Sequence, residues 1–220
     1  MEKQYYVEWI LLLTAVAAGA VDVISFATLG GVFASAMTGN FALLAYYVAH
    51  GDPQAAMGSI VALAGFVAGC AVGVGQRRGR EPNAALTALL VEEAALLLVF
   101  ALYALWTSAG APGGHLQILL LAAAMGLQAV TGQTISLTTI VFTTTLTKLV
   151  GTIADSIANG DTRGLKDIRL QSSVVVAYLF GALLAGALIV HKSSVVALLP
   201  FVGVAIALAV HLKGNAPRSL

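Results

Sequence analysis

Polar side chains are scarce within the long apolar stretches of this 220-residue chain, and those that occur there are the candidates for chemistry. A carboxylate or an ammonium group is costly to bury among apolar residues unless it has a partner or meets water. We therefore predict that Asp22, Glu92 or Glu93 couples a function to protons or cations. Lys148 is predicted to face an anionic solute or, in the alternative, to pair with Glu92 or Glu93.

The sequence Thr38-Gly39-Asn40 is a second kind of candidate, because it interrupts the first long apolar tract. If a helix begins there, its first backbone N–H groups lack partners and attract anions or electronegative groups. Thr38 is expected to cap this helix, and Gly39 is expected to let a solute approach the backbone closely. In the alternative interpretation, Thr38 and Asn40 only satisfy a buried break, and Asp22 is their hydrogen-bond anchor.

The second long apolar tract has a corresponding interruption, which ends at Lys148. Gln128 lies at a depth in this tract similar to that of Asp22 in the first. We predict that the two interruptions bind one substrate together. The predicted substrate-binding residues are Thr38, Gly39, Asn40, Gln128, Thr144, Thr147 and Lys148.

The composition indicates a membrane protein: 59% of the residues are hydrophobic and only 10% are charged, whereas soluble domains carry about 25% charged residues. The net charge of +1 gives no reason to expect nucleic-acid binding. A single cysteine, Cys70, excludes an intramolecular disulfide and a cysteine metal cluster. The sequence contains no metal-spaced ligand set, nucleotide loop or nucleophile motif, so we expect neither an enzyme nor a bound metal or cofactor.

The elements that must position the polar residues are long apolar helices. Four uninterrupted helices are predicted, at about 55–75, 84–106, 172–190 and 194–212. Glycines four residues apart in the first of these favour close helix packing. Two longer tracts, at about 9–50 and 115–158, would each form a straight helix of about 60 Å, twice the apolar thickness of a bilayer. Each tract therefore folds back, either as two full crossings or as one crossing plus a re-entrant segment.

The distribution of lysine and arginine chooses between these alternatives, since cytoplasmic loops are enriched in both. With six net crossings, nine of the ten basic residues outside the tracts lie on one side, and only Lys192 lies on the other. With eight crossings the split becomes six to four. We therefore predict an all-α polytopic membrane protein with six net transmembrane crossings plus two broken, re-entrant segments, and with both termini in the cytoplasm.

The two halves of the chain repeat the same order of a punctured tract followed by two clean helices. Residues 32–52 align with residues 141–161 without a gap, and seven of the 21 positions are identical. Each half has three net crossings, which is an odd number, so the second half is expected to have the opposite orientation to the first in the membrane. We predict a single membrane domain, 1–220, made of inverted repeats at about 8–106 and 115–212.

Several motifs in the two halves are specific enough to compare with known families. The first half contains Gly19-x-x-Asp22 and Gly31-Val-Phe-Ala-Ser-Ala-Met-Thr38-Gly39-Asn40, and the second contains Met125-Gly126-Leu-Gln128 before a threonine-rich stretch. These motifs resemble the YoaK-like family of bacterial inner-membrane proteins, and the resemblance covers nearly the whole chain. It implies a multi-pass protein of the bacterial inner membrane but no substrate. The second half departs from the first, because Thr147 is followed by Lys148 where Thr38 is followed by glycine.

The leading hypothesis from the sequence is a secondary transporter of a small, anionic or carboxylate-bearing solute, with a midplane site at the two helix breaks. A passive channel for a small solute or anion is the nearest alternative, and a non-transporting membrane sensor or accessory factor is a third. The expected partners are the lipid bilayer, the solute and protons. The sequence leaves the oligomeric state open, a homodimer included.

Overall fold

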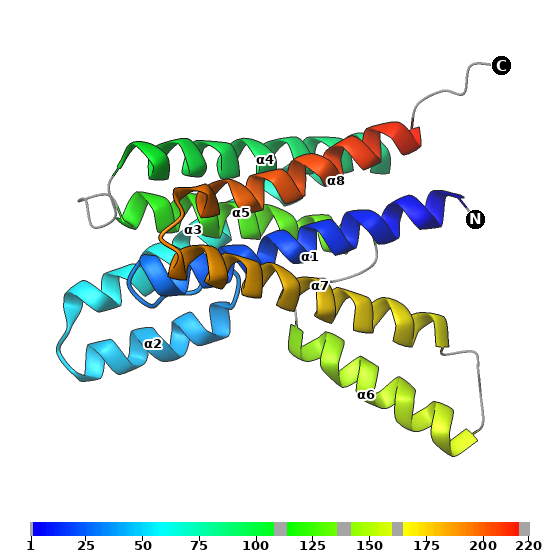
Figure 1. Ribbon diagram of the computed structural model, residues 1–220, viewed down its shortest axis with the longest axis horizontal. Coiled ribbons are helices and arrows are strands. Elements are labelled where there is room, and N and C mark those ends of the chain that lie inside the picture. The colour runs from blue at the N-terminus through cyan, green and yellow to red at the C-terminus, as the bar shows by residue number, and fades with distance from the viewer. Residues whose placement is uncertain (1, 108–113, 136–141, 160–164, 216–220) are drawn as a thin grey trace.

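The computed structural model describes residues 2–107, 114–135, 142–159 and 165–215, and all regular secondary structure in these residues is helical (Figure 1). Long helices alternate with two shorter ones, α2 and α6, and a single 3₁₀ turn, η1, precedes the last helix. In chain order the elements are α1 (Glu2–Thr28), α2 (Met37–Ala49), α3 (Pro53–Arg77), α4 (Pro82–Trp106), α5 (Gly114–Thr134), α6 (Phe142–Asn159), α7 (Leu165–Val190), η1 (Ser194–Leu198) and α8 (Leu199–Asn215).

Six of the described helices are long and apolar enough to cross a membrane, as the sequence predicts. They are α1, α3, α4, α5, α7 and η1 with α8. Asp52 fixes the start of α3, where its carboxylate accepts a hydrogen bond of 3.0 Å from the Ala55 N–H and Pro53 follows at the first helical position. Each of the four predicted clean helices is present, with ends that differ from the expected bounds by up to seven residues, the largest difference being at the start of α7.

The two long tracts are each divided into a long helix and a short one. The first tract forms α1, an irregular segment at 29–36, and α2, whose 13 residues span about 20 Å and cannot cross a bilayer alone. The second tract forms α5 and α6. In Figure 1, α2 and α6 both begin near the middle of the molecule and then run toward opposite ends, α6 toward the end that carries both chain termini.

A close contact between backbones joins α1 to α7. A Cβ atom added to Gly19 would lie 2.1 Å from the Tyr178 carbonyl oxygen, and one added to Gly181 would lie 2.0 Å from the Val16 carbonyl oxygen. Glycine is therefore required at both positions, because any side chain would push the two helices apart.

The same arrangement joins α5 to α3. A Cβ atom on Gly126 would lie 2.2 Å from the Phe66 carbonyl oxygen, and one on Gly69 would lie 2.0 Å from the Ala123 carbonyl oxygen. The glycine spacing in α3 predicts close packing, and these distances confirm it. In both helix pairs, the carbonyl oxygen that faces a glycine belongs to the residue three positions before the glycine of the opposite helix.

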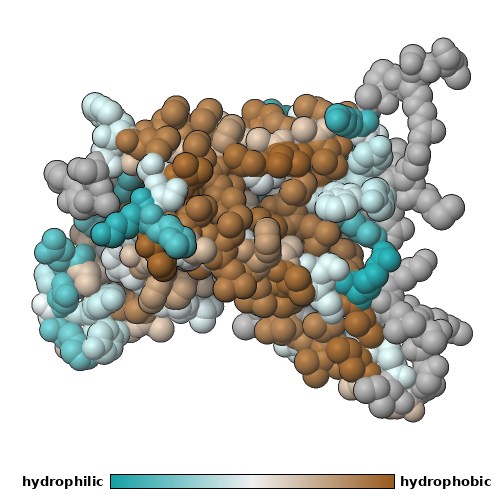
Figure 2. Space-filling model, viewed as in Figure 1, coloured by the Kyte–Doolittle hydropathy of each residue, from teal (hydrophilic) through white to brown (hydrophobic). Residues whose placement is uncertain are grey.

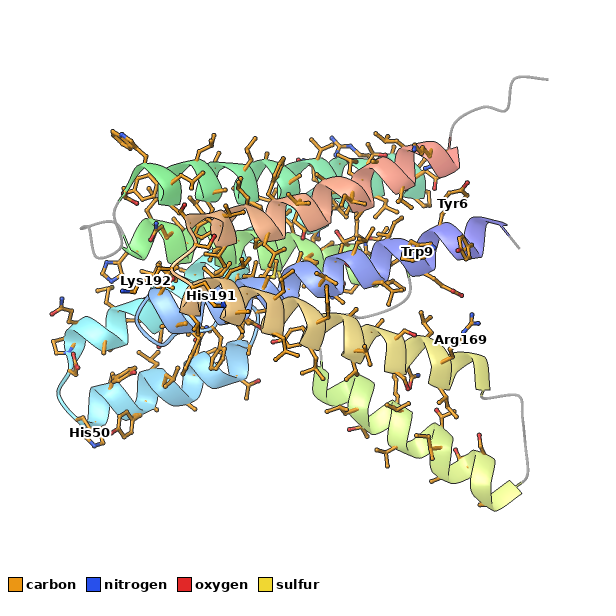
Figure 3. The ribbon with its side chains drawn as sticks, in the orientation of Figure 1. Tyr6, Trp9, His50, Arg169, His191 and Lys192 are labelled. Carbon is orange, nitrogen blue, oxygen red and sulfur yellow. The ribbon has the colours of Figure 1, made fainter. Side chains whose placement is uncertain are left out.

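The remaining long helices complete a compact bundle. α8 packs on α1 and α4, and α4 also packs on α5, while α2 contacts α3 and α6 contacts α7. Figure 2 shows apolar residues covering the middle of one face, with hydrophilic residues gathered toward its two ends. Figure 3 places Tyr6, Trp9 and Arg169 toward the end that carries the N-terminus, and His50 and Lys192 toward the other. This distribution is that of a multi-pass membrane protein with an apolar belt.

Candidate functional site

The irregular segment 29–36 lies between α1 and α2 and is shaped by two glycines. Gly30 has a φ of 91° and Gly31 has a φ of 76°, a backbone conformation that side chains strongly disfavour. This segment reverses the chain at the end of α1, so that α2 begins near the middle of the molecule (Figure 1). Two buried polar side chains, one on α1 and one on α2, hold it in place.

Asp22 is the first of these side chains, and only 4% of its surface is exposed. Its carboxylate accepts hydrogen bonds from the Ser35 N–H at 2.9 Å, the Ser35 hydroxyl at 2.5 Å and the Tyr178 hydroxyl at 2.8 Å. Three donors therefore satisfy a buried carboxylate and tie α1, the 29–36 segment and α7 together. The prediction that Asp22 anchors Thr38 and Asn40 was wrong, because its carboxylate binds Ser35 and Tyr178.

Asn40 is the second of these side chains and is fully buried. Its Oδ1 accepts a hydrogen bond of 3.0 Å from the Phe33 N–H, and its Nδ2 donates one of 2.6 Å to the Phe33 carbonyl. The side-chain amide thus pairs with both groups of one residue's backbone, as a neighbouring strand would. Irregular backbone within an apolar bundle needs such partners, because water is not available to it.

Thr38 does not cap α2, and Gly39 packs against an aromatic ring. The N-cap of α2 is Ala36, without a side-chain hydrogen bond, and Thr38 is exposed in the first turn, so the prediction that Thr38 caps the helix was wrong. A Cβ atom on Gly39 would lie 3.2 Å from the Phe33 ring. Phe33 itself stacks on Phe26, with ring centroids 5.0 Å apart. Packing against Phe33 therefore accounts for a small residue at position 39.

Gln128 lies in the buried part of α5 and joins this helix to α1. Its Nε2 donates a hydrogen bond of 2.9 Å to the Thr14 carbonyl, while its Oε1 is buried without a partner among the described residues. The Thr14 hydroxyl is already used within its own helix, at 2.9 Å from the Ile10 carbonyl. Gln128 thus leaves one polar atom of the core unsatisfied.

The second interruption is only partly visible at the level of side chains. Thr144 lies in the first turn of α6, but its side chain falls outside what the structure describes, as does the start of the threonine-rich stretch at 136–141. Thr147 and Lys148 are exposed on α6. The Lys148 carbonyl accepts a hydrogen bond of 2.8 Å from the Thr152 hydroxyl.

Lys148 is not paired with Glu92 or Glu93 within the described part of the chain. The two carboxylates are on α4, whereas α6 packs on α7. The one described ion pair joins Arg169 to Glu8 at 3.7 Å, near the end that carries the N-terminus. The pairing alternative for Lys148 therefore finds no support in the structure.

The adjacent carboxylates Glu92 and Glu93 have different environments, because neighbouring residues of a helix point in directions about 100° apart. Glu92 accepts a hydrogen bond from the Gln76 side chain of α3. Glu93 is completely buried, and neither of its carboxylate oxygens has a hydrogen-bond partner among the described residues. The sequence predicts the same role for both residues, whereas the structure gives them different hydrogen-bond environments.

The predicted site residues do not form one cluster of side chains. Asp22 and Asn40 bind the same segment, whereas Gln128 and Glu93 are buried separately in the bundle. Sequence reasoning missed Tyr178, which is on α7, 156 residues after Asp22 in the chain, and donates a hydrogen bond to it. Tyr178 stands in an otherwise apolar run, three residues before Gly181. A single polar residue in such a run is the signal that could have identified it.

Comparison with known families agrees with the motifs and with the helical bundle. A family described as "Protein of unknown function (DUF1275)" matches residues 10–211. This chain belongs to that family. It is also 30% identical, over 192 residues, to the UPF0700 transmembrane protein YoaK of Bacillus subtilis (strain 168), a match that covers 84% of each chain. The resemblance inferred from the sequence is thus confirmed. No solved structure matches the chain.

Proposed function

We propose that this protein is a secondary transporter of a small anionic or carboxylate-bearing solute in the bacterial inner membrane, with both termini in the cytoplasm. The observation that carries this proposal is the pair of short helices, α2 and α6, which begin near the middle of the molecule and run toward opposite ends (Figure 1). Broken helices that meet near the midplane are a recurrent plan of transporters.

An inverted repeat explains why the two short helices run in opposite directions. In the proposed repeat, α1 to α4 are equivalent to α5 to α8. The contacts support this equivalence, since α1 packs on α7 as α5 packs on α3, and α1 packs on α8 as α5 packs on α4. The reciprocal glycine contacts at Gly19 and Gly181, and at Gly126 and Gly69, have the same spacing in both pairs. Each half has three crossings, so the halves have opposite orientations.

The solute site is proposed at the first turns of α2 and α6. The first turn of α2 has no side-chain cap. The Met37 and Gly39 N–H groups donate to the backbone carbonyls of Ser35 and Ala36, so the Thr38 N–H and the positive dipole end are what this turn offers to an electronegative group. Thr38 is exposed beside them, and Lys148 is exposed on α6. Together with Asn40, which fixes the segment before α2, these groups favour an anion or a carboxylate over a cation.

Proton coupling is proposed for Glu93. A buried carboxyl group without a hydrogen-bond partner is costly in a membrane protein and indicates a function. Glu92 is engaged by Gln76, and Asp22 is saturated by three donors. Asp22 therefore acts in this proposal as the anchor that fixes the 29–36 segment, and Glu93 acts as the proton carrier.

The two repeats differ at this anchor. Asp22 follows Gly19 by three residues, and the equivalent residue after Gly126 is Ala129. Tyr178 precedes Gly181 by three residues, and Phe66 precedes Gly69 likewise. Both members of the Asp22–Tyr178 hydrogen bond are thus replaced by apolar residues in the other pair, so the two half-sites have separate roles.

Uptake into proteoliposomes that contain the full chain tests the proposal. Lactate, pyruvate, succinate and benzoate are supplied as radiolabelled solutes under an inward proton gradient. At least one is expected to accumulate, and an uncoupler is expected to abolish its accumulation. Glu93→Gln should abolish accumulation against a gradient, whereas Glu81→Gln, the same change at the exposed N-cap of α4, should not.

Three outcomes would contradict parts of this proposal. If no carboxylate enters faster than in protein-free liposomes, the proposed substrate class is wrong. If uptake continues unchanged with the uncoupler and only equilibrates, the protein is a passive channel. If Lys148→Ala and Thr38→Val both leave uptake unaltered, the proposed site beside the starts of α2 and α6 is wrong.

A further inference from the structure

A second candidate site lies apart from the first turns of α2 and α6, at the end of the bundle opposite the chain termini. There the helix ends of α1, α4, α5 and α7 and the η1 turn enclose a cavity of about 500 Å³. This volume is within the range of pockets that bind small organic molecules. Leu29 is the one lining residue of the cavity that belongs to the 29–36 segment.

The inner wall of the cavity is apolar. It is formed mainly by aliphatic and aromatic side chains from four different elements, among them Ile24, Phe100, Ala104, Ile189 and Val196. Phe100 is also part of the main hydrophobic core, so this wall belongs to the rigid interior of the bundle. Such a surface favours the apolar body of a ligand and offers no partner to a second charged group.

The rim of the cavity is rich in hydrogen-bond donors. Gln117 and Thr107 lie on one side and are joined by a contact of 3.4 Å between Nε2 and Oγ1. Lys192, Ser193 and Ser194 lie on the other. No aspartate or glutamate is among the described lining residues, so the rim carries a net positive charge.

Lys192 occupies an unusual position in this rim. Its φ is 51°, which makes it the one non-glycine residue with a positive φ among the described residues. Two backbone hydrogen bonds hold the turn, from the Lys192 N–H to the Ile189 carbonyl and from the Ser193 N–H to the Leu188 carbonyl, both at 2.9 Å. Glycine would adopt this backbone without strain, so a lysine here indicates a use for its side chain.

The ammonium group of Lys192 is available to a ligand. The residue is exposed, and it has no ion-pair partner in the part of the chain that the structure describes. Figure 3 places it at the end of α7, away from Arg169 and the N-terminus. It is also the one basic residue that the charge distribution assigns to this side of the membrane.

We infer that this cavity binds an amphipathic monocarboxylate. The carboxylate group is held by the Lys192 ammonium and the hydroxyl groups of Ser193 and Ser194, and the apolar body lies against Phe100 and Ala104. A dicarboxylate is excluded because its second charge would face the apolar wall. A cation is excluded by the charge of the rim. Binding here does not depend on the transport proposed above, and it can be measured without flux.

Thermal unfolding of the full chain in phosphatidylcholine nanodiscs tests this inference, with octanoate as the probe. A ligand that binds only the folded protein stabilises it by RT ln(1 + L/Kd), where L is the free ligand concentration, so the unfolding temperature begins to rise once this concentration reaches the Kd. Octanoate is expected to raise it with this logarithmic dependence on concentration. Octanol, which has the same body without the charge, and octyltrimethylammonium are expected to have at least about tenfold weaker effects, since a charged hydrogen bond contributes that much to affinity.

Variants separate this site from general partitioning into lipid. Lys192→Gln is expected to weaken the octanoate effect by at least about tenfold. Lys192→Gly, which keeps the turn without strain, should do the same. Lys213→Gln is the matched control, because this exposed lysine is in the last turn of α8, at the other end of the bundle. Ala104→Phe, which fills the inner wall, should abolish the response.

Equal octanoate responses in the wild type, Lys192→Gln and Ala104→Phe would overturn the inference. An octanol response as strong as that of octanoate would also overturn it, because the rim charge would then have no role. Phospholipid that is retained by the wild type and lost in Ala104→Phe, without any octanoate response, would assign the cavity to a lipid chain instead.

Discussion

Asp22 and Asn40 perform related tasks from two different helices. Both side chains are buried and form hydrogen bonds with the 29–36 segment, Asp22 with Ser35 and Asn40 with Phe33. The segment would otherwise leave peptide groups unsatisfied within an apolar bundle. At the scale of single residues, the buried polar groups of the first tract therefore shape the backbone.

The hydrogen bond between Tyr178 and Asp22 can be measured as a coupling energy. We expect Tyr178→Phe to lower the free energy of unfolding by about 1.5 to 3 kcal/mol, as for hydrogen bonds to charged groups. Asp22→Ala should cost more, at least about 3 kcal/mol, because the Ser35 N–H also loses its acceptor. In the Asp22→Ala background, Tyr178→Phe should have little further effect, which thermal unfolding of all four proteins in detergent would detect.

Tyr103→Phe is the matched control, since the Tyr103 hydroxyl has no hydrogen bond among the described residues and its loss should be neutral. Strictly additive effects of Asp22→Ala and Tyr178→Phe would contradict the coupling, because independent sites add.

Replacing Glu93 is predicted to raise the free energy of unfolding, in contrast to the substitutions at Asp22 and Tyr178. Glu93→Met replaces a buried carboxyl group without partners by an apolar side chain of similar length. We expect this variant to unfold at a higher temperature than the wild type, with a gain of about 1 to 3 kcal/mol. The same variant should lose proton-coupled uptake, since a residue kept at a cost in stability is kept for function. A clear loss of stability in Glu93→Met would indicate that the carboxyl group has a structural partner.

At the scale of helices, backbone contact decides the packing. Gly126→Ala would place a methyl carbon 2.2 Å from the Phe66 carbonyl oxygen, so α3 and α5 must separate. We expect a loss of at least about 2 kcal/mol, which is typical of overpacking in a well-packed core. Gly75→Ala is the control on α3, because nothing lies within 4 Å of its added Cβ atom. Thermal unfolding and expression in membranes would measure the difference, and equal stability of the two variants would contradict the close contact.

Much of this helix-level organisation could be predicted from the sequence, because apolar length and bilayer thickness are directly comparable. The four clean helices and the division of both long tracts followed from that comparison. The hydrogen-bond partners could not be predicted. Ser35 meets Asp22 only because Gly30 and Gly31 turn the chain back, and Tyr178 reaches Asp22 only because two glycines let α7 approach α1. The different surroundings of Glu92 and Glu93 depend on the rotation of α4, which an apolar helix does not encode in its pattern.

At the scale of the whole molecule, the account rests on one geometric statement. In the proposed topology, the two short helices enter the membrane from opposite sides, so that α2 ends outside and α6 ends inside. The described basic residues agree with this orientation, since Lys213 and Arg169 lie toward the end with the termini and Lys192 lies at the other. If α2 and α6 lay on the same side, the two first turns would not meet, and neither the inverted repeat nor a shared solute site would be supported.

Labelling of single cysteines in intact cells tests this statement most directly. In a Cys70→Ala background, Asp52→Cys reports the segment after α2 and Ala158→Cys reports the last turn of α6. Thr107→Cys and Arg78→Cys serve as references for the outer and inner sides. The account predicts that a membrane-impermeant maleimide labels Asp52→Cys and Thr107→Cys in intact cells, and labels Ala158→Cys and Arg78→Cys only after the membrane is opened. Labelling of Asp52→Cys and Ala158→Cys from the same side would contradict it.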